Sequence, residues 1–514
     1  MSRRPQAVEL PPISGLDRTK GHLGRQLTQA LRDAIRGGNL KPGDLLPSSR
    51  QLASSLGIAR GTVLEAYEQL IAEGFFDSRP RVGTRVALAL AKPRQPGSGS
   101  QKQEANTTSI SIPTSAIAFA KVAEQFKMHP PIPFAVSVPV GPAAPDETWR
   151  RLGNRIRARG PGAPSGYDDP QGIKVLREAV AGYVRRSRSV QCRAEQVIIT
   201  TGTQQGLYIA CQVLVGATDK VWVEDPAYWG ITKILESTGY SEQMVRVPVD
   251  DAGIDVRAGV ALAKDARAAF VTPSHQYPLG MAMSMSRREA LLAWARNSDA
   301  WIVEDDYDSE LRYAGHPFPS LQGLAPDRVI YLGTFSKILF PSLRLGYAIV
   351  PDALMPAFCG ARLLMDRHTP TADQHVLAAF INEGHLDRHI RRIRSVYADR
   401  RSHLIAMLHR WIPKEFAWLQ PSDQGMHMVL WLRSSMDDTL LTLRAIEAGV
   451  AVRAVSPMYS TGKGRSGLVL GLGGFSNEQI EAAVRSLAAI IMSMSQTKPL
   501  TRRSPRFRDF TGPV

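Results

Sequence analysis

A lysine stands between small hydroxyl residues at the end of an apolar stretch, an arrangement that could do covalent chemistry. Residues 333–337 read Gly-Thr-Phe-Ser-Lys, and Arg344 follows Lys337 by seven residues. A lysine amine forms Schiff bases with aldehydes, while adjacent hydroxyl groups and an arginine can hold a phosphate group. Because a lysine in a loop is more often simply solvated, this motif needs support from elsewhere in the chain.

Three other segments place polar or aromatic residues after strand-like runs. Acidic residues crowd at 304–310, Thr-Gly-Thr-Gln-Gln-Gly spans 201–206 ahead of a helix, and Tyr228 closely follows the run at 221–224. Free backbone N–H groups at a helix start can cradle a phosphate, and an aromatic ring can stack on a flat ligand. Together with the lysine and the arginine, these groups are what pyridoxal 5′-phosphate (PLP) requires.

Metal binding is the alternative interpretation of the acidic run. No histidine cluster accompanies residues 304–310 in the sequence. Mg²⁺ sites usually borrow oxygens from a substrate phosphate. We therefore predict no metal site.

The elements that must position these groups alternate between strand and helix. Strand-like runs lie at 196–200, 221–224, 268–272, 301–304, 328–332 and 345–350, with helical periodicity between several of them. This order predicts an α/β body with a largely parallel sheet covered by helices on both faces. Beyond residue 351 the pattern is helical to 408 and then mixed, which predicts a smaller C-terminal α+β subdomain.

The first 90 residues follow a different pattern. Helical periodicity over 23–35 and 61–73 flanks a short helix that Ser48 or Ser49 would cap, and residues 75–86 are typical of a hairpin. Three helices with a tight turn between the last two, followed by a hairpin, predict an α+β winged helix-turn-helix.

Polar and basic residues stand at the starts of the second and third of these helices. They are Ser48, Ser49, Arg50, Arg60 and Thr62. Helix N-termini meet phosphates, and an arginine that leads a recognition helix can reach guanine edges in the major groove. Helix capping and solvation are the plainer explanation, and they alone account for the two serines. The combination predicts double-stranded DNA as a partner.

Composition sets limits on the class of protein. The 514 residues carry 63 Lys and Arg against 47 Asp and Glu, a net charge of +16, and 44% hydrophobic residues exclude disorder of the whole chain. Three cysteines without a C-x-x-C pair, no long apolar run and no signal peptide favour a cytoplasmic protein without a membrane segment.

Composition also divides the chain. We expect a DNA-binding domain at 18–88 and a body at 118–496. Residues 89–117 between them are rich in Gly, Ser, Gln and Pro, which is typical of a flexible linker. Residues 497–514 read as a basic, disordered tail.

The first module resembles the GntR-type winged helix-turn-helix of bacterial regulators. The similarity runs from about residue 23 to 86, through LPSSRQLASSLGIARGTVLEAYEQLIAEG and the following Arg-Val-Gly-Thr. It implies DNA contacts at Arg50, Arg60 and Thr62 and in the wing around Gly83.

The body resembles a fold-type I aminotransferase. The segments that carry this similarity are VTPSHQYPLG, VEDDYDSELRYAG, YLGTFSKILFPSLRLGY and EGHLDRHIRRIRSVYADRR. Two independent sets of motifs follow one another in the order of the MocR/GabR regulators, in which a GntR-type head is linked to an aminotransferase-like domain. The whole chain is therefore similar to that family.

This resemblance implies a role for individual residues around the cofactor ring. Lys337 would hold PLP as a Schiff base, and Asp305 would pair with the pyridine nitrogen. Tyr307 would hydrogen-bond the ring oxygen, and Tyr228 would stack on the ring.

The resemblance also implies the phosphate ligands. They would be Thr203, Gln204, Thr334 and Arg344. Tyr167 would reach in from the neighbouring subunit, although Asp168 stands where the family usually has glycine. His275 and Gln276 would lie in the loop that lines the ring.

One further departure concerns substrates. Aminotransferases and some of these regulators place an arginine in a late strand to hold the substrate carboxylate, and Val469 aligns best with it here. Without that contact, ordinary transamination loses its main orienting interaction. Arg453 or Arg465 could substitute for this arginine. The simpler expectation for both is a solvent-exposed side chain that binds no ligand.

The resemblance implies a homodimeric, PLP-dependent bacterial transcription regulator. Its body would sense PLP, an amine or an amino acid as effector, and paired heads would bind operator DNA. An active aminotransferase with a DNA-binding head is the alternative. A body that only dimerises is a third possibility, but Lys337, Asp305, Tyr307 and Arg344 speak against it.

Overall fold

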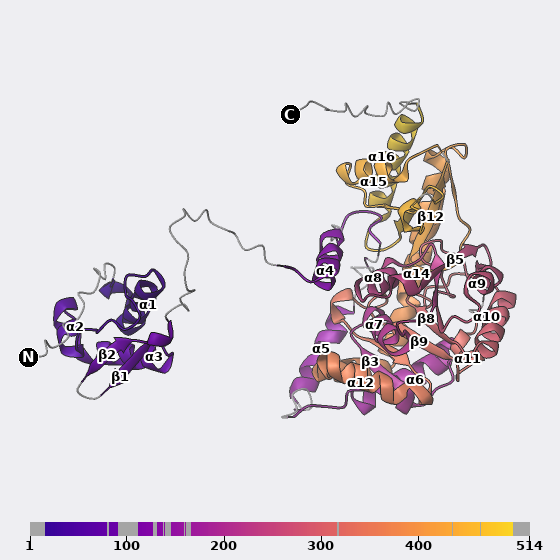
Figure 1. The fold of residues 1–514 in the computed structure, drawn as a ribbon. Helices are drawn as coiled ribbons and strands as arrows, with labels where there is room; N and C mark the ends of the chain where they lie inside the picture. The colour runs from indigo at the N-terminus through magenta and orange to yellow at the C-terminus, as the bar shows by residue number, and fades with distance from the viewer. Residues whose placement is uncertain are drawn as a thin grey trace, which may run out of the picture. The chain divides into compact units, whose positions relative to one another are not determined.

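The computed structural model divides the chain into two compact units, Met1–Ile110 and Ser111–Val514 (Figure 1). It describes residues 16–79, 82–90, 111–126, 131–136, 138, 145–158, 160, 166–315, 318–433, 435–462 and 464–496. The predicted tail at 497–514 and residues 91–110 of the predicted linker lie outside the described residues.

The smaller unit is a three-helix module with a hairpin. Its elements are α1 (Leu23–Arg36), α2 (Ser49–Leu56), α3 (Arg60–Ala72), β1 (Phe76–Arg79) and β2 (Gly83–Val86). The two strands pair antiparallel. Leu27 and Leu31 of α1 pack with Val63 of α3 in a common core. The predicted winged helix-turn-helix is confirmed.

Local sequence explains the turn between α2 and α3. Ser48 caps α2 in a capping box, because its hydroxyl accepts from the N–H of Gln51 while the Gln51 side chain accepts from the N–H of Ser48. Gly57 ends the helix in the left-handed region at φ 62°, which glycine adopts without strain.

An eight-stranded sheet forms the centre of the body. Its strands, in spatial order, are β3 (Val197–Thr200), β10 (Gly346–Ile349), β9 (Val329–Thr334), β8 (Trp301–Asp306), β7 (Ala268–Val271), β4 (Val221–Asp225), β5 (Met244–Asp250) and β6 (Gly253–Ile254). The run from β9 to β5 is parallel, whereas β10 and β6 pair antiparallel with their neighbours. The predicted, largely parallel sheet is confirmed.

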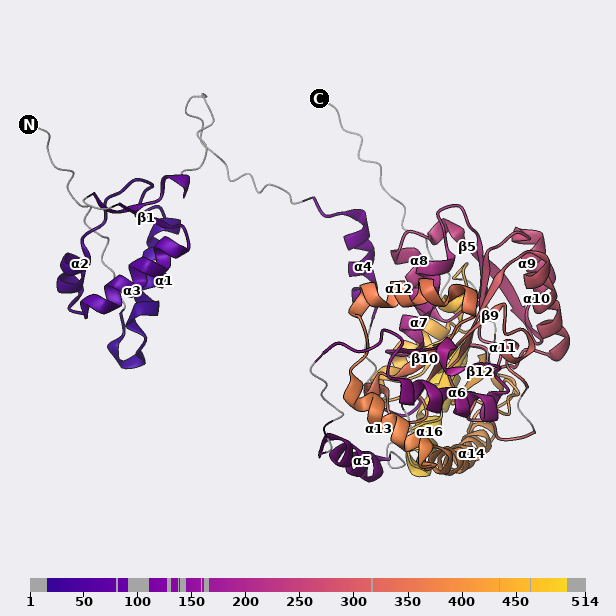
Figure 2. The ribbon, with the colours of Figure 1, turned by 90° about the horizontal axis from the view of Figure 1, so that it is seen from below.

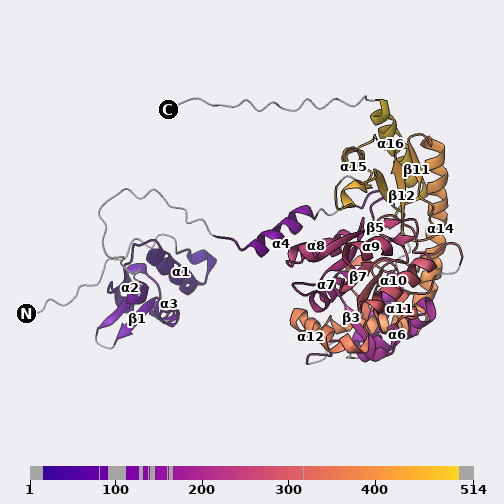
Figure 3. The same ribbon diagram turned by 45° about the vertical axis from the view of Figure 1, so that its right-hand side comes forward.

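Helices cover both faces of this sheet (Figure 3). Alternate strand residues such as Ile198 and Val223 pack in one core, and their neighbours Val197 and Trp222 lie in the cores of the other face. The first face carries α7 (Thr203–Leu214), α8 (Trp229–Ser237) and α12 (Met355–Asp366). The other carries α6 (Lys174–Arg188), α9 (Val256–Ala263), α10 (Met285–Asn297), α11 (Leu321–Leu324) and α13 (Thr371–Asn382). Figure 2 shows α13 beside α5 (Asp146–Ala158).

A second, antiparallel sheet forms the predicted smaller subdomain. Its spatial order is β11 (Ala417–Leu419), β12 (His427–Leu432), β14 (Gly467–Gly471) and β13 (Arg453–Ala454). It is accompanied by α14 (His385–Trp411), α15 (Asp438–Glu447) and α16 (Asn477–Gln496).

Two parts of the body depart from the expectations. Strands β5 and β6 were not predicted, since β5 lies near the sheet edge, contains Pro248 and is only partly buried. Helix α4 (Thr114–Gln125) begins inside the segment predicted as linker. Among the described residues, no helix is long and apolar enough to cross a membrane.

Candidate functional site

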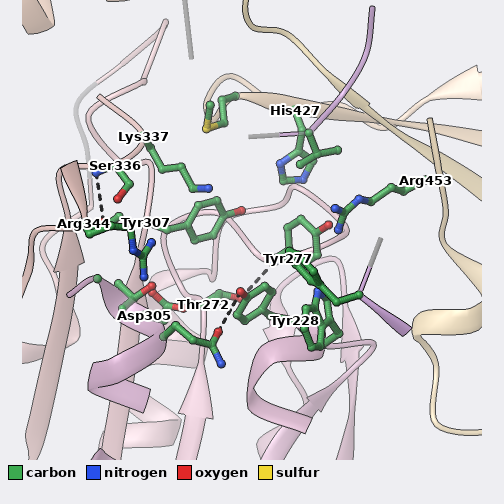
Figure 4. Close-up of a pocket in the computed structure, with 18 residues that line it drawn as sticks. Tyr228, Thr272, Tyr277, Asp305, Tyr307, Ser336, Lys337, Arg344, His427 and Arg453 are labelled. Atoms are coloured by element: carbon green, nitrogen blue, oxygen red, sulfur yellow. Dashed lines mark hydrogen bonds between the residues drawn. The ribbon is translucent and has the colours of Figure 1, made fainter. Parts of the chain in front are cut away.

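A cavity of about 220 Å³ opens at the carboxyl ends of the parallel strands. In α/β sheets this edge is where ligands bind. Eight residues predicted for the cofactor line it (Figure 4): Thr203, Gln204, Tyr228, Asp305, Tyr307, Thr334, Lys337 and Arg344. The structure thus brings together residues from four separate sequence motifs.

The acidic residues 304–306 have different roles because successive side chains of a strand point to opposite faces of the sheet. Glu304 accepts hydrogen bonds from the N–H groups of Leu321 and Gln322 at 3.1 and 3.0 Å. Asp306 is paired with Arg188 at 2.8 Å. Asp305 lies between them on β8, so its side chain points to the opposite face, into the cavity.

Asp305 is suited to a cationic partner. Its Oδ1 is buried without a hydrogen-bond partner among the described residues. Burial and the charge of Asp306 raise the pKa of Asp305 to about 7. A positive ring nitrogen beside this carboxyl would satisfy the free oxygen and hold the group ionised. The residues present therefore fit a protonated pyridine.

Lys337 lies in the loop after β9, with its ammonium group in the cavity (Figure 4). Burial lowers the pKa of Lys337 to about 8, although the charges of Asp308 and Asp305 act in the opposite direction. A lysine with such a pKa is partly neutral at physiological pH and can act as a nucleophile. Thr334 orders the loop by accepting from the N–H of Ser336 at 3.2 Å.

The end of the cavity beside Arg344 is built for an anion. Helix α7 begins there, so its first N–H groups have no partners within the helix. Gly202 precedes the helix at φ 115°, and a Cβ at this position would lie 3.3 Å from the Arg344 guanidinium. Only glycine combines this backbone with the close approach. These groups fit a phosphate.

The aromatic wall differs in part from expectation. Tyr228 lines the cavity and donates a hydrogen bond to Gln204 Oε1 at 3.0 Å. His275 and Gln276 were predicted to lie in the loop that lines the ring. That loop lines the cavity through Tyr277, whereas the side chains of His275 and Gln276 are buried next to it. The family resemblance identifies this loop, but it does not define which side chain of the loop faces the cavity.

His275, Asp308 and His427 form a buried polar cluster next to Tyr307, and His427 also lines the cavity. Their potential ligand atoms lie within 4.8 Å of one another. The Asp308 carboxylate contacts His275 Nδ1 at 3.0 Å and accepts from the Met426 N–H at 3.0 Å. The Tyr307 hydroxyl donates to the His275 carbonyl at 2.9 Å. We interpret the cluster as the support that fixes Tyr307 in the cavity wall.

Tyr167 does not join the cavity of its own chain. Its side chain is 79% exposed, and the Arg367 guanidinium lies 4.2 Å from the centre of its ring. An exposed position is compatible with the expected contact to a neighbouring subunit. The contact therefore stays a prediction.

The structure separates the two arginines that could replace the missing carboxylate ligand. Arg453 lines the cavity, whereas the simpler expectation from the sequence was a solvent-exposed side chain. Arg465 lies over the rings of Trp431 and Trp418, at 4.1 and 4.9 Å from their centres. Val469 is fully buried in an apolar cluster. Sequence periodicity could not show which of the two arginines faces the cavity, because β13, the strand that carries Arg453, has only two residues.

The predicted DNA-contacting residues lie on the head. Arg50 and Arg60 are exposed near the starts of α2 and α3, and Thr62 is half-buried. Ser48 and Gly83 line a hollow between α2, α3 and the hairpin. The Arg60 Nε donates to the Ser49 hydroxyl at 3.3 Å, so the two helix starts are held together.

Comparisons with known families match the two units separately. Residues 135–487 match the model described as aminotransferase class I and II. Residues 23–86 match that of bacterial regulatory proteins of the gntR family. The fold itself resembles that of the α-aminoadipate aminotransferase LysN from Thermus thermophilus, solved with N-(5′-phosphopyridoxyl)-L-leucine. The TM-score is 0.67 at 28% identity, covering 74% of this chain and 98% of that one.

Two relatives match along nearly the full length. The probable rhizopine catabolism regulatory protein MocR of Rhizobium meliloti is 35% identical over 93% of this chain and 95% of its own. The HTH-type pyridoxine biosynthesis transcriptional regulator PdxR of Corynebacterium glutamicum is 34% identical over 88% and 93%. Both are regulators rather than enzymes by name.

Proposed function

The chain belongs to the MocR family of transcriptional regulators, with a GntR-type head and an aminotransferase-type body, and we propose that it senses an amine or amino acid through PLP held on Lys337. The observation that carries this proposal is the cavity. Eight residues predicted from the sequence line it. They include a lysine with a lowered pKa, an aspartate with one unpaired buried oxygen, and an arginine beside a helix start that fits an anion.

When bound, PLP would supply an aldehyde that exchanges amines and a ring that withdraws electrons. The protein's part is to bind and orient. Arg344 and the start of α7 would hold the phosphate, and Asp305 would keep a proton on the ring nitrogen. Tyr228 would fix the plane of the ring, and Lys337 would hold the reactive carbon until an incoming amine displaces it.

The route from the cavity to the head would begin at α4. Phe126, which ends this helix, lines the cavity, and α4 is the first α-helix of the body after the head. Two conformations of the body could differ in the position of Phe126. A ligand would shift the equilibrium between them only by the difference between its affinities for the two conformations. We propose that this shift changes operator binding by a homodimer, in which Tyr167 completes the partner's phosphate site.

The head offers a direct test of operator reading. We expect Arg60→Ala to weaken binding to the protein's own promoter by ~1–3 kcal/mol, because an arginine at the start of a recognition helix can make a bidentate base contact. Arg32→Ala is the matched control, since Arg32 is engaged with Glu73 at 2.8 Å. Equal promoter affinity of Arg60→Ala and wild type in a gel-shift titration would show that Arg60 reads no base.

Turnover distinguishes the regulator from an aminotransferase. We expect amino acids supplied with 2-oxoglutarate or pyruvate to give keto acid at well under ~1 s⁻¹, below typical metabolic enzymes. The reason is that Val469 occupies the place of the usual carboxylate ligand, and a substrate shifted by ~1 Å can lose about 100-fold in rate. Sustained keto-acid production near the enzymatic rate would instead favour the aminotransferase.

A further inference from the structure

Arg453 enters the cavity from β13 of the smaller sheet, on the side opposite Lys337 and Arg344 (Figure 4). It also lines an adjoining hollow of about 580 Å³, which shares Phe126 and Trp229 with the cavity. Arg453 therefore lies where a ligand would pass from the hollow to Lys337.

Among the residues that the structure describes, no counter-charge contacts the guanidinium of Arg453. Within the described ranges no hydrogen bond or ion pair involves it, and its Nε is buried without a partner. In the same hollow, by contrast, Arg246 is neutralised by Asp225 at 2.8 Å. A partly buried cation without a partner is costly, so a ligand anion at this point would gain a charge-assisted, bidentate contact.

Strand register explains how Arg453 reaches the position. Arg453 and Val469 are directly paired across β13 and β14. Side chains of such a pair lie on the same face, with Cβ atoms about 4.5–5.5 Å apart. The charge missing at Val469 is therefore present on the neighbouring strand, on a side chain long enough to cover the same face.

The surroundings of Arg453 restrict the ligand further. Among the described residues that line the cavity, Asp305 is the single acid, and it lies at the end beside Lys337. Tyr277 and His427 flank Arg453 (Figure 4). Burial and the neighbouring His275 lower the pKa of His427 to about 3, so this ring is neutral. The distal end thus presents one positive charge among uncharged rings.

We propose that Arg453 binds the carboxylate of an amino-acid effector whose amine reacts at Lys337. This inference rests on the proposed function and narrows the effector from any amine to one that carries an anionic group. It also places that group at β13 rather than at β14, the strand of Val469.

The test compares amino acids with the amines that lack their carboxylate. PLP-loaded, full-length protein is titrated with glycine, β-alanine, 4-aminobutyrate, 5-aminopentanoate and 6-aminohexanoate, each beside an alkylamine of matched length. Binding is followed by calorimetry and by the visible absorbance. We expect at least one acid to bind tenfold or more tightly than its matched amine. Arg453→Gln should bring that ratio close to one, and Arg453→Lys should leave an intermediate ratio.

Arg465→Gln is the matched control, because Arg465 lies on tryptophan rings outside the cavity, and it should keep the wild-type ratio. The assignment would be overturned if the wild-type protein bound every amino acid and its matched amine with about equal affinity. It would also be overturned if Arg453→Gln kept the wild-type preference for the amino acid. Loss of bound PLP from Arg453→Gln would overturn it too, since Arg453 would then hold the cofactor. Calorimetric binding that depends on Arg453 without any absorbance change would support Arg453 but contradict amine exchange at Lys337.

Discussion

Lys337→Ala should abolish covalent attachment of PLP while wild type becomes yellow on incubation with it. Lys337 is the one lysine that lines the cavity among the described residues, and its lowered pKa of about 8 makes its amine available for reaction. Borohydride should fix the cofactor to the wild-type peptide containing residue 337, as seen by mass spectrometry. In Lys337→Ala we expect no such adduct and no visible band of the lysine-bound form.

Lys174→Ala provides the control for this experiment. Its side chain is 75% exposed in a surface pair with Glu178, so its loss should change neither the band nor the adduct. Wild-type protein that stays colourless with excess PLP would remove the cofactor from the account. An adduct on a different lysine would retain the cofactor but move its site.

Arg188→Met should destabilise the body strongly. Arg188 and Asp306 are paired at 2.8 Å with side chains only 4% and 0% exposed. Removing the arginine leaves a buried carboxylate with Tyr331 as its remaining side-chain partner, at 2.6 Å. Loss of one member of a buried pair costs about 3–5 kcal/mol. All eight tryptophans lie between residues 149 and 431, so urea unfolding followed by tryptophan fluorescence reports on the body alone.

Arg193→Met is the matched control for Arg188→Met. Arg193 pairs with Asp352 at 3.0 Å, but the side chains are 64% and 63% exposed. An exposed pair contributes about 0–1 kcal/mol. If both substitutions lowered the free energy of unfolding by the same small amount, the Arg188–Asp306 pair would not support the strand that carries Asp305.

The sequence predicts the elements better than it predicts side-chain direction. Helix caps and strand-like runs are local, so α2 and all the parallel strands except β5 could be predicted. The alternation of β8 also explains why Asp305 faces the cavity. Inward-facing side chains on loops and very short strands depend on packing between distant segments. This is why Tyr277 was missed and why Arg453 could not be distinguished from Arg465.

Tyr167 and the acidic run differ in how far a single chain defines their surroundings. Tyr167 is exposed in the single chain, and its contact to a phosphate site in a partner subunit stays a prediction. The acidic run shows the opposite case, in which one chain is sufficient. Once the strand is formed, its members separate into an acceptor of backbone hydrogen bonds, an ion-pair partner and a carboxylate with one unpaired oxygen in the cavity.

Promoter affinity of the full-length protein, measured by fluorescence anisotropy, tests the central claim most directly. It should be compared for PLP-free protein, PLP-loaded protein and PLP-loaded protein with a binding amino acid. Coupling between two sites is typically worth about 1–3 kcal/mol, so we expect at least two of these states to differ by about fivefold or more. Lys337→Ala should not respond to the amino acid. Identical affinities in all three wild-type states would contradict the account, because the body would then not regulate the head.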